Sequence, residues 1–168
     1  MRYSYCPDCG ARLAERSMGD EGLVPYCEGC ARPWFDGFYS AVCVLAINER
    51  GEAVMQRQSE FSKDRLNLVT GFIKPGETAA QAAIREVKEE TGLFLEAPRT
   101  VDTYWYKPDG VFMVQVIGRV KKAPFRLSTE VEDAQWVPLK EAVVRGLPEG
   151  TAVHDLLSGY LSGRYAGR

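Results

Sequence analysis

The sequence lacks the long apolar segments and the charge imbalance that mark several classes of protein. No apolar run approaches the roughly 20 residues that a membrane-spanning helix requires, so no membrane segment is predicted. The first residues contain no apolar core of a secretory signal, and we therefore expect a cytoplasmic protein. Lysine and arginine total 21 against 23 acidic residues. Such a balance provides no general attraction to nucleic acid or to an anionic membrane.

A change of composition near residue 37 predicts two domains. Residues 1–36 are rich in cysteine, glycine and proline and show little apolar periodicity, so they need a cross-link or a metal to fold. The later residues show the apolar patterns of ordinary strands and helices. We therefore predict a small domain over residues 1–36 and a larger domain over residues 37–168.

The larger domain is predicted to have an α/β fold. Its helices are expected from the capping box at Thr78 to Gly92, over a short segment from Pro138, and over residues 151–163. Residues 61–65 are expected to form a loop. Strands are predicted over residues 40–47, 53–57, 66–70, 95–104, 111–120 and 134–137. This order favours a mixed sheet packed between helices.

Three glutamates share one edge of the first predicted helix. At about 100° per residue, Glu90 lies about 40° to one side of Glu86 and Glu89 about 60° to the other. Their mutual repulsion would be reversed by a hard cation such as Mg²⁺ or Mn²⁺. Taken alone, the cluster is interpreted more simply as a solvated acidic face. The buried stripe expected beside them consists of Ala80, Ala83, Ile84 and Val87.

The residues around these glutamates favour metal binding. Gly71 is followed after five residues by Glu77, and after seven more by Arg85-Glu86-Val87; Glu89-Glu90 and Gly92-Leu93 complete the pattern. Residues 71–93 therefore resemble the complete Nudix box, in the predicted loop and helix where it belongs. The resemblance covers about residues 38–165. It implies the Nudix α/β/α sandwich and hydrolysis of a nucleoside diphosphate linked to a second group.

The resemblance also implies roles for individual residues. Glu86, Glu89 and Glu90 match the glutamates that bind divalent metal. Arg85 matches the arginine that orients them, and Glu77 matches the acid that ends the loop. Bound metals would bridge diphosphate oxygens and activate a water, whose proton passes to a nearby carboxylate. Glu89 is our preferred general base, with Glu130 as the alternative.

Four of the five cysteines form two Cys-x-x-Cys pairs, Cys6/Cys9 and Cys27/Cys30, with 17 residues between the pairs. This spacing is typical of a structural zinc ribbon, in which four thiolates bind one Zn²⁺. Disulfides or a redox pair are disfavoured by a cytoplasmic setting and by the absence of a thioredoxin-like context. Residues 1–36 contain four arginines and no lysine against six acidic residues, which argues against nucleic-acid binding. The fifth, Cys43, is expected to be a core residue.

A zinc ribbon directly before a Nudix domain resembles the zinc-ribbon-containing NADH pyrophosphatase family of bacteria. Residues 70–73 resemble the loop of that family whose phenylalanine, here Phe72, stacks on a substrate ring. Residues 130–136 resemble the segment whose acidic residue, here Glu130, supplies a late metal ligand. Residues 150–153 resemble the start of the family's last helix.

One departure concerns substrate recognition. The family's Ser-Gln-Pro-Trp-Pro-Phe-Pro motif is replaced by residues 102–108, in which only Trp105 and Pro108 are retained. One of Tyr104, Trp105 and Tyr106 is the candidate partner for Phe72 in holding a ring, although packing of one or two of them on the sheet is an equally good explanation. The resemblance does not extend to the large N-terminal domain of the full-length enzymes, and we expect none here.

The preferred substrate is therefore NADH or NAD, with ADP-ribose, FAD or another ADP-linked diphosphate as alternatives. The family resemblance implies a site built between two subunits, so we expect a homodimer and a small nucleotide substrate. Two interpretations from other classes are a nucleotide sensor without hydrolysis and a regulator whose ribbon binds DNA. The intact glutamates argue against the first, and the acidic ribbon argues against the second.

Overall fold

The chain divides into two compact units in the computed structural model, which describes residues 2–58, 65–108 and 110–166. The first unit is Met1–Phe38 and the second is Tyr39–Arg168. Most of the expected loop at residues 61–65 lies outside the described residues. No helix in the described ranges is both long enough and apolar enough to cross a membrane.

The first unit is a small antiparallel sheet with little apolar interior. Strands β1 (Ala14–Ser17), β2 (Leu23–Cys27) and β3 (Arg32–Pro33) pair in that order, with a short 3-10 helix η1 (Gly19–Glu21) between β1 and β2. Among the described residues, its buried hydrophobic side chains are Cys6, Val24, Tyr26 and Cys27. Two of these four are cysteines, so apolar packing contributes little to this unit.

The second unit contains the larger sheet. In the described residues its strands are β4 (Tyr39–Ile47), β5 (Glu52–Arg57), β6 (Val69–Phe72), β7 (Glu96–Tyr106), β8 (Val111–Arg119) and β9 (Asp133–Pro138). They follow the order β7-β8-β4-β5-β9, and β6 also pairs with β4. Strand β4 runs parallel to β8 and antiparallel to β5 and β6. The mixed sheet predicted from the sequence is therefore confirmed.

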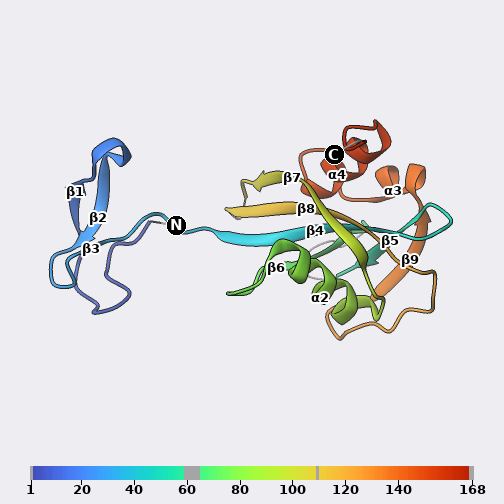
Figure 1. The fold of residues 1–168 in the computed structure, drawn as a ribbon, viewed down its shortest axis with the longest axis horizontal. Helices are drawn as coiled ribbons and strands as arrows, with labels where there is room; N and C mark the ends of the chain where they lie inside the picture. The colour runs from blue at the N-terminus through green and yellow to red at the C-terminus, as the bar shows by residue number, and fades with distance from the viewer. Residues whose placement is uncertain (1, 59–64, 109, 167–168) are drawn as a thin grey trace. The chain divides into compact units, whose positions relative to one another are not determined.

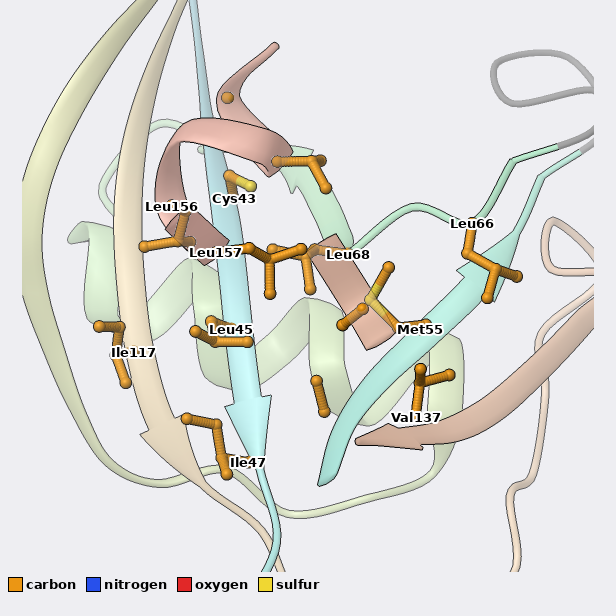
Figure 2. Close-up of a cluster of buried hydrophobic side chains, with 14 of the residues drawn as sticks. Cys43, Leu45, Ile47, Met55, Leu66, Leu68, Ile117, Val137, Leu156 and Leu157 are labelled. Carbon is orange, nitrogen blue, oxygen red and sulfur yellow. The ribbon is translucent and has the colours of Figure 1, made fainter. Parts of the chain in front are cut away.

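Helices cover both faces of this sheet (Figure 1). Helix α2 (Ala79–Thr91) lies on one face, and α3 (Leu139–Arg145) and α4 (Ala152–Leu161) lie on the other. Alternate residues of β4 face the two sides of the sheet. Cys43, Leu45 and Ile47 pack in the cluster that includes α4 residues (Figure 2), whereas Val42, Val44 and Ala46 pack with α2. Period-two alternation in one central strand thus builds two apolar layers, and Cys43 is the core residue expected.

Two local expectations differ from the structure. The strand predicted over residues 66–70 begins later, at Val69, because Leu66 and Asn67 form only isolated bridges. The buried stripe of α2 includes Ala82, Ala83 and Val87, while Ala80 and Ile84 are only half-buried. Helix α2 is therefore turned slightly from the predicted orientation, toward the face that carries Glu90.

Candidate active site

Local hydrogen bonds define both ends of α2. The Thr78 side chain accepts from the Gln81 amide at 3.2 Å, and the Gln81 side chain accepts from the Thr78 amide at 2.8 Å. This is the predicted capping box. Gly92 ends the helix in the left-handed conformation at φ 73°, and its amide donates to the Lys88 carbonyl. The helix therefore begins and ends where the sequence predicts.

A cleft of about 470 Å³ lies in the second unit. The three glutamates of α2 line it together with Arg85, and Glu130 joins them from the segment before β9. Phe72, at the end of β6, also lines it. The fold thus gathers residues from distant parts of the sequence, from Ala41 to Val153, around one cavity.

The three helix glutamates lie in different environments. The Glu89 side chain is 53% exposed, whereas the Glu86 side chain is 12% exposed. Glu90 is 4% exposed and belongs to the buried face of the helix. The expectation that all three carboxylates share an edge beside the buried stripe is therefore wrong for Glu90. The rotation of α2 noted above turns this residue toward the sheet.

Two glutamine amides hold the Glu90 carboxylate. Gln56 Nε2 donates to one Glu90 oxygen at 2.6 Å, and Gln58 Nε2 donates to the other at 2.9 Å. Burial raises the pKa of Glu90 to about 7, the two amides oppose that change, and the nearby charges of Glu86 and Glu130 add to it. Sequence reasoning missed both glutamines; the signal was Gln56, a polar residue directly after the apolar residues 53–55 of β5.

Arg85 links the loop before α2 to the glutamates. Its guanidinium donates to both oxygens of Glu77 at 2.6 and 2.8 Å, and to the Phe72 carbonyl at 2.9 Å. It also donates to Glu86 at 2.6 Å and to Glu89 at 3.1 Å. Hydrogen bonds from Arg85 and from the Lys74 amide lower the pKa of Glu77 to about 2. Arg85 is thus in direct contact with two of the three glutamates that it was expected to orient, Glu86 and Glu89.

Gly71 allows Glu86 to approach strand β6. A Cβ atom at residue 71 would lie 2.0 Å from the Glu86 carboxyl carbon, which is closer than any real contact. Any side chain at this position would therefore displace Glu86 from the cleft. The glycine that begins the sequence pattern has a steric reason to be there.

Of the aromatic candidates, Phe72 and one of the three residues 104–106 line the cleft. Phe72 is exposed, and its ring centroid lies 5.7 Å from that of Tyr39. Tyr106 lines the cleft, whereas Tyr104 packs against the core and Trp105 does not line the cleft. Successive residues of a strand face opposite sides, so Tyr106 and Trp105 could not both face the cleft.

The strand order also changes how a substrate ring could be held. Phe72 is on β6 and Tyr106 is on β7, with β4 and β8 between them. Three inter-strand spacings amount to about 14 Å, so these two residues are not neighbours across adjacent strands. Tyr39, on the intervening β4, is an aromatic neighbour of Phe72. No signal in the sequence distinguished Tyr39 from the other residues of its strand as a neighbour of Phe72.

The four cysteines of the first unit converge. Their sulfur atoms all lie within 4.8 Å of one another, with 3.5 Å between Cys9 and Cys27 and 3.9 Å between Cys6 and Cys30. All are free thiols. Four sulfur ligands at this separation fit a tetrahedral zinc ion. In the described part of the chain, this is the one preassembled group of three or more histidine, cysteine or acidic ligands.

The glutamates of the cleft suit a different ion. Carboxylate oxygens are the ligands that Mg²⁺ and Mn²⁺ prefer, and four glutamates line a single cavity. The carboxylate oxygens of the four glutamates are not gathered as closely as the four sulfur atoms, since two of these glutamates, Glu86 and Glu89, form ion pairs with Arg85. The four carboxylates therefore fit a hard divalent cation. Such a cation would either displace the ion pairs of Arg85 or bind the glutamates beside them.

Comparison with known proteins identifies relatives of the chain. A family model described as the NUDIX domain matches residues 37–156. The NAD-capped RNA hydrolase NudC of Stutzerimonas stutzeri is 25% identical over 165 residues, covering 88% of this chain and 55% of that protein. The NAD-capped RNA hydrolase ndx-9 of Caenorhabditis elegans is 30% identical over 156 residues, covering 88% of this chain and 41% of that protein. The chain thus spans about half the length of these relatives, or less.

The fold also has solved counterparts. The crystal structure of a NUDIX hydrolase from Nitrosomonas europaea matches with a TM-score of 0.77 at 19% identity. The match covers 99% of this chain and 94% of that one. At this level of identity the likeness concerns the fold alone.

Proposed function

Because the chain belongs to the Nudix family, we propose that it is a metal-dependent pyrophosphohydrolase that cleaves the diphosphate of a dinucleotide. The observation that carries this proposal is the composition of one cleft. Four glutamates line it beside the exposed ring of Phe72. Carboxylates suit a metal that grips a diphosphate, and an exposed aromatic ring suits a flat base. The cleft therefore offers contacts for both parts of a dinucleotide.

The carboxylates have distinct proposed tasks. Glu86, Glu89, Glu90 and Glu130 would hold Mg²⁺ or Mn²⁺, which supplies positive charge against the diphosphate and promotes ionisation of a water. Arg85 keeps Glu86 and Glu89 in position through the ion pairs described above. Glu89 is the preferred general base because its side chain is half-exposed, and Glu130 is the alternative. Both oxygens of Glu90 already accept amide hydrogen bonds, which suits a ligand better than a base.

The reaction is a hydrolysis. The oxygen of water bonds to one phosphorus atom, the bond from that phosphorus to the bridging oxygen breaks, and the carboxylate accepts a proton from the water. From NADH the products are AMP and reduced nicotinamide mononucleotide. Phe72 and its neighbour Tyr39 would hold a ring while the glutamates fix the diphosphate, so that the scissile bond is placed from two sides.

NADH or NAD is the preferred substrate. The relatives named above are hydrolases of NAD-capped RNA, which presents the same dinucleotide at the end of an RNA chain. Free NADH and the capped form therefore belong to one proposal, and ADP-ribose and FAD are the alternatives. The four cysteines would hold one structural Zn²⁺ in the ribbon, here proposed as residues 1–36, and we propose a homodimer.

The test is a substrate panel with a matched pair of phenylalanine variants. We would measure kcat/KM for NADH, NAD⁺, ADP-ribose, FAD, NAD-capped RNA and dGTP. Phe72→Ala should lower kcat/KM for dinucleotides by up to about tenfold, the worth of an aromatic contact, and leave dGTP unchanged. Phe94→Ala removes a similarly exposed ring that does not line the cleft and should not change kcat/KM for any substrate of the panel.

Three outcomes separate the alternatives. If dGTP is the best substrate and Phe72→Ala has no effect, the dinucleotide proposal fails while the family membership stands. Tight binding of NADH without turnover in the presence of Mg²⁺ would indicate a sensor. Salt-dependent binding of duplex DNA would indicate a regulator.

A further inference from the structure

We propose that Gln56 and Gln58 are positioning residues that hold Glu90 in the orientation in which it binds the catalytic metal. Both glutamines precede Glu90 by more than 30 residues and reach it only through the fold. This inference rests on the proposed function, because it takes Glu90 as a metal ligand. Gln56 lies in β5 and Gln58 directly after it, whereas the metal ligand Glu90 lies in α2.

Strand geometry places both amides on the same carboxylate. Gln56 and Gln58 are two residues apart, so their side chains leave the chain on one face. That face carries Val54, which packs in the layer beneath α2. Gln56 is fully buried and Gln58 is 8% exposed, so water does not compete strongly for their amides. Each amide donates to a different oxygen of Glu90.

The orientation of Gln56 points to function more than to packing. With its nitrogen toward Glu90, its own Oε1 is buried and has no hydrogen-bond partner among the described residues. An unpaired buried acceptor costs free energy that a hydrocarbon side chain of the same size would avoid. Rotating the amide would not help, because two acceptor oxygens would then face each other. The amide is therefore held in place by its bond to the carboxylate.

Two N–H donors on one carboxylate prevent its rotation. Each oxygen has a second lone pair, which stays available for a cation. Hydrogen-bonding partners behind a metal ligand typically change metal affinity by about 10- to 100-fold. We therefore expect the two glutamines to act on metal affinity through Glu90.

The experiment measures Mn²⁺ binding directly, by the electron paramagnetic resonance signal of free Mn²⁺, in the full chain. Gln56→Met and Gln58→Met keep the side-chain length but cannot donate, and each should raise the Kd for Mn²⁺ by about tenfold or more. The matched control is Gln115→Met. Gln115 is also fully buried, but its amide donates to Ala152 and Asp155 of α4 and makes no bond to Glu90. Its loss should change the Kd by less than about twofold, the scatter expected of a site without shared partners.

A double-mutant cycle tests whether the effect passes through Glu90. In a Glu90→Gln background, Gln56→Met should raise the Kd for Mn²⁺ no further. An additive effect, or an equal loss in Gln115→Met, would overturn the proposal. If Glu86→Gln and Glu90→Gln both bind Mn²⁺ as well as wild type, the proposed metal site itself fails, which is a separate outcome.

A measurement on the unmodified chain covers the case in which a variant does not fold. In ¹⁵N-labelled protein, the side-chain amide resonances of Gln56 and Gln58 should shift during a Mg²⁺ titration, with one common apparent Kd. The Gln115 amide serves as the internal reference and should not shift. Unchanged Gln56 and Gln58 resonances at saturating Mg²⁺ would refute the inference.

Discussion

The four cysteines of the first unit and the four glutamates of the second are both candidate metal ligands, but very different interiors surround them. Among its described residues, the first unit buries Val24, Pro25 and Tyr26 besides two of its cysteines. The second has an apolar layer on each side of β4. In the first unit, metal-binding free energy would be folding free energy. In the second, apolar burial stabilises the fold, so acidic ligands can be kept for chemistry even though they repel one another.

The largest expected effect is loss of the first unit without zinc. Cys27→Ser should abolish zinc binding and unfold residues 1–38, because apparent zinc-binding free energies of about 10–16 kcal/mol have no apolar substitute there. The second unit should keep its Tm. Elemental analysis and amide hydrogen exchange measure the two effects. Cys43→Ser is the matched control, since Cys43 lies in the other core and should leave one zinc per chain. Purified protein with two disulfides and no zinc would contradict this.

The glutamates should show the opposite pattern. Glu86→Gln and Glu90→Gln are each expected to lower kcat at saturating Mg²⁺ by on the order of 100-fold or more, since each removes negative charge that would hold the metal. Thermal unfolding should change little in comparison. Glu96→Gln, at an exposed position away from the cleft, is the control. A near-normal kcat in either cleft variant would show that the ligand assignment is wrong.

A core truncation should affect the second unit alone. Leu156 is fully buried in the layer beneath α4, so Leu156→Ala should lower the free energy of unfolding by roughly 2–5 kcal/mol. Val144→Ala, on the exposed side of α3, should change it by less than about 0.5 kcal/mol. Denaturant titration gives both values, and zinc content should stay at one per chain. Loss of zinc from Leu156→Ala would show that the two units do not fold independently.

The smallest expected effect concerns the ion pair between Glu77 and Arg85. The pKa of Glu77 is lowered to about 2, so the pair stabilises the fold above the ordinary carboxyl pKa near 4.5 and loses this contribution as pH falls toward 2. Glu77→Gln should therefore lower Tm by a constant amount between pH 5 and 7, because in this range Glu77 of the wild-type chain is ionised in both the folded and the unfolded state. The difference should shrink below pH 4.5. A difference that grows toward acid pH would contradict the assigned contact.

Features that depend on neighbours in the sequence were predicted well. The ends of α2 follow from Thr78, Gln81 and Gly92, because the bonds that close a helix end join residues three or four positions apart. The convergence of the four N-terminal cysteines on one point follows from the spacing of the two Cys-x-x-Cys pairs. The clustering of Glu86, Glu89 and Glu90 follows from helical periodicity, and the predicted residues do line one cleft.

The environments of those residues depended on the tertiary structure. Which side of α2 is buried decides that Glu90 faces Gln56 and Gln58 while Glu89 faces solvent. The register of β7 against β8 decides that Tyr106, and neither Tyr104 nor Trp105, lines the cleft. These outcomes come from packing between elements far apart in the chain. Local patterns therefore identified the glutamates and Arg85 of the candidate site, and the fold determined which of them are buried, paired or open to a ligand and which other residues join them.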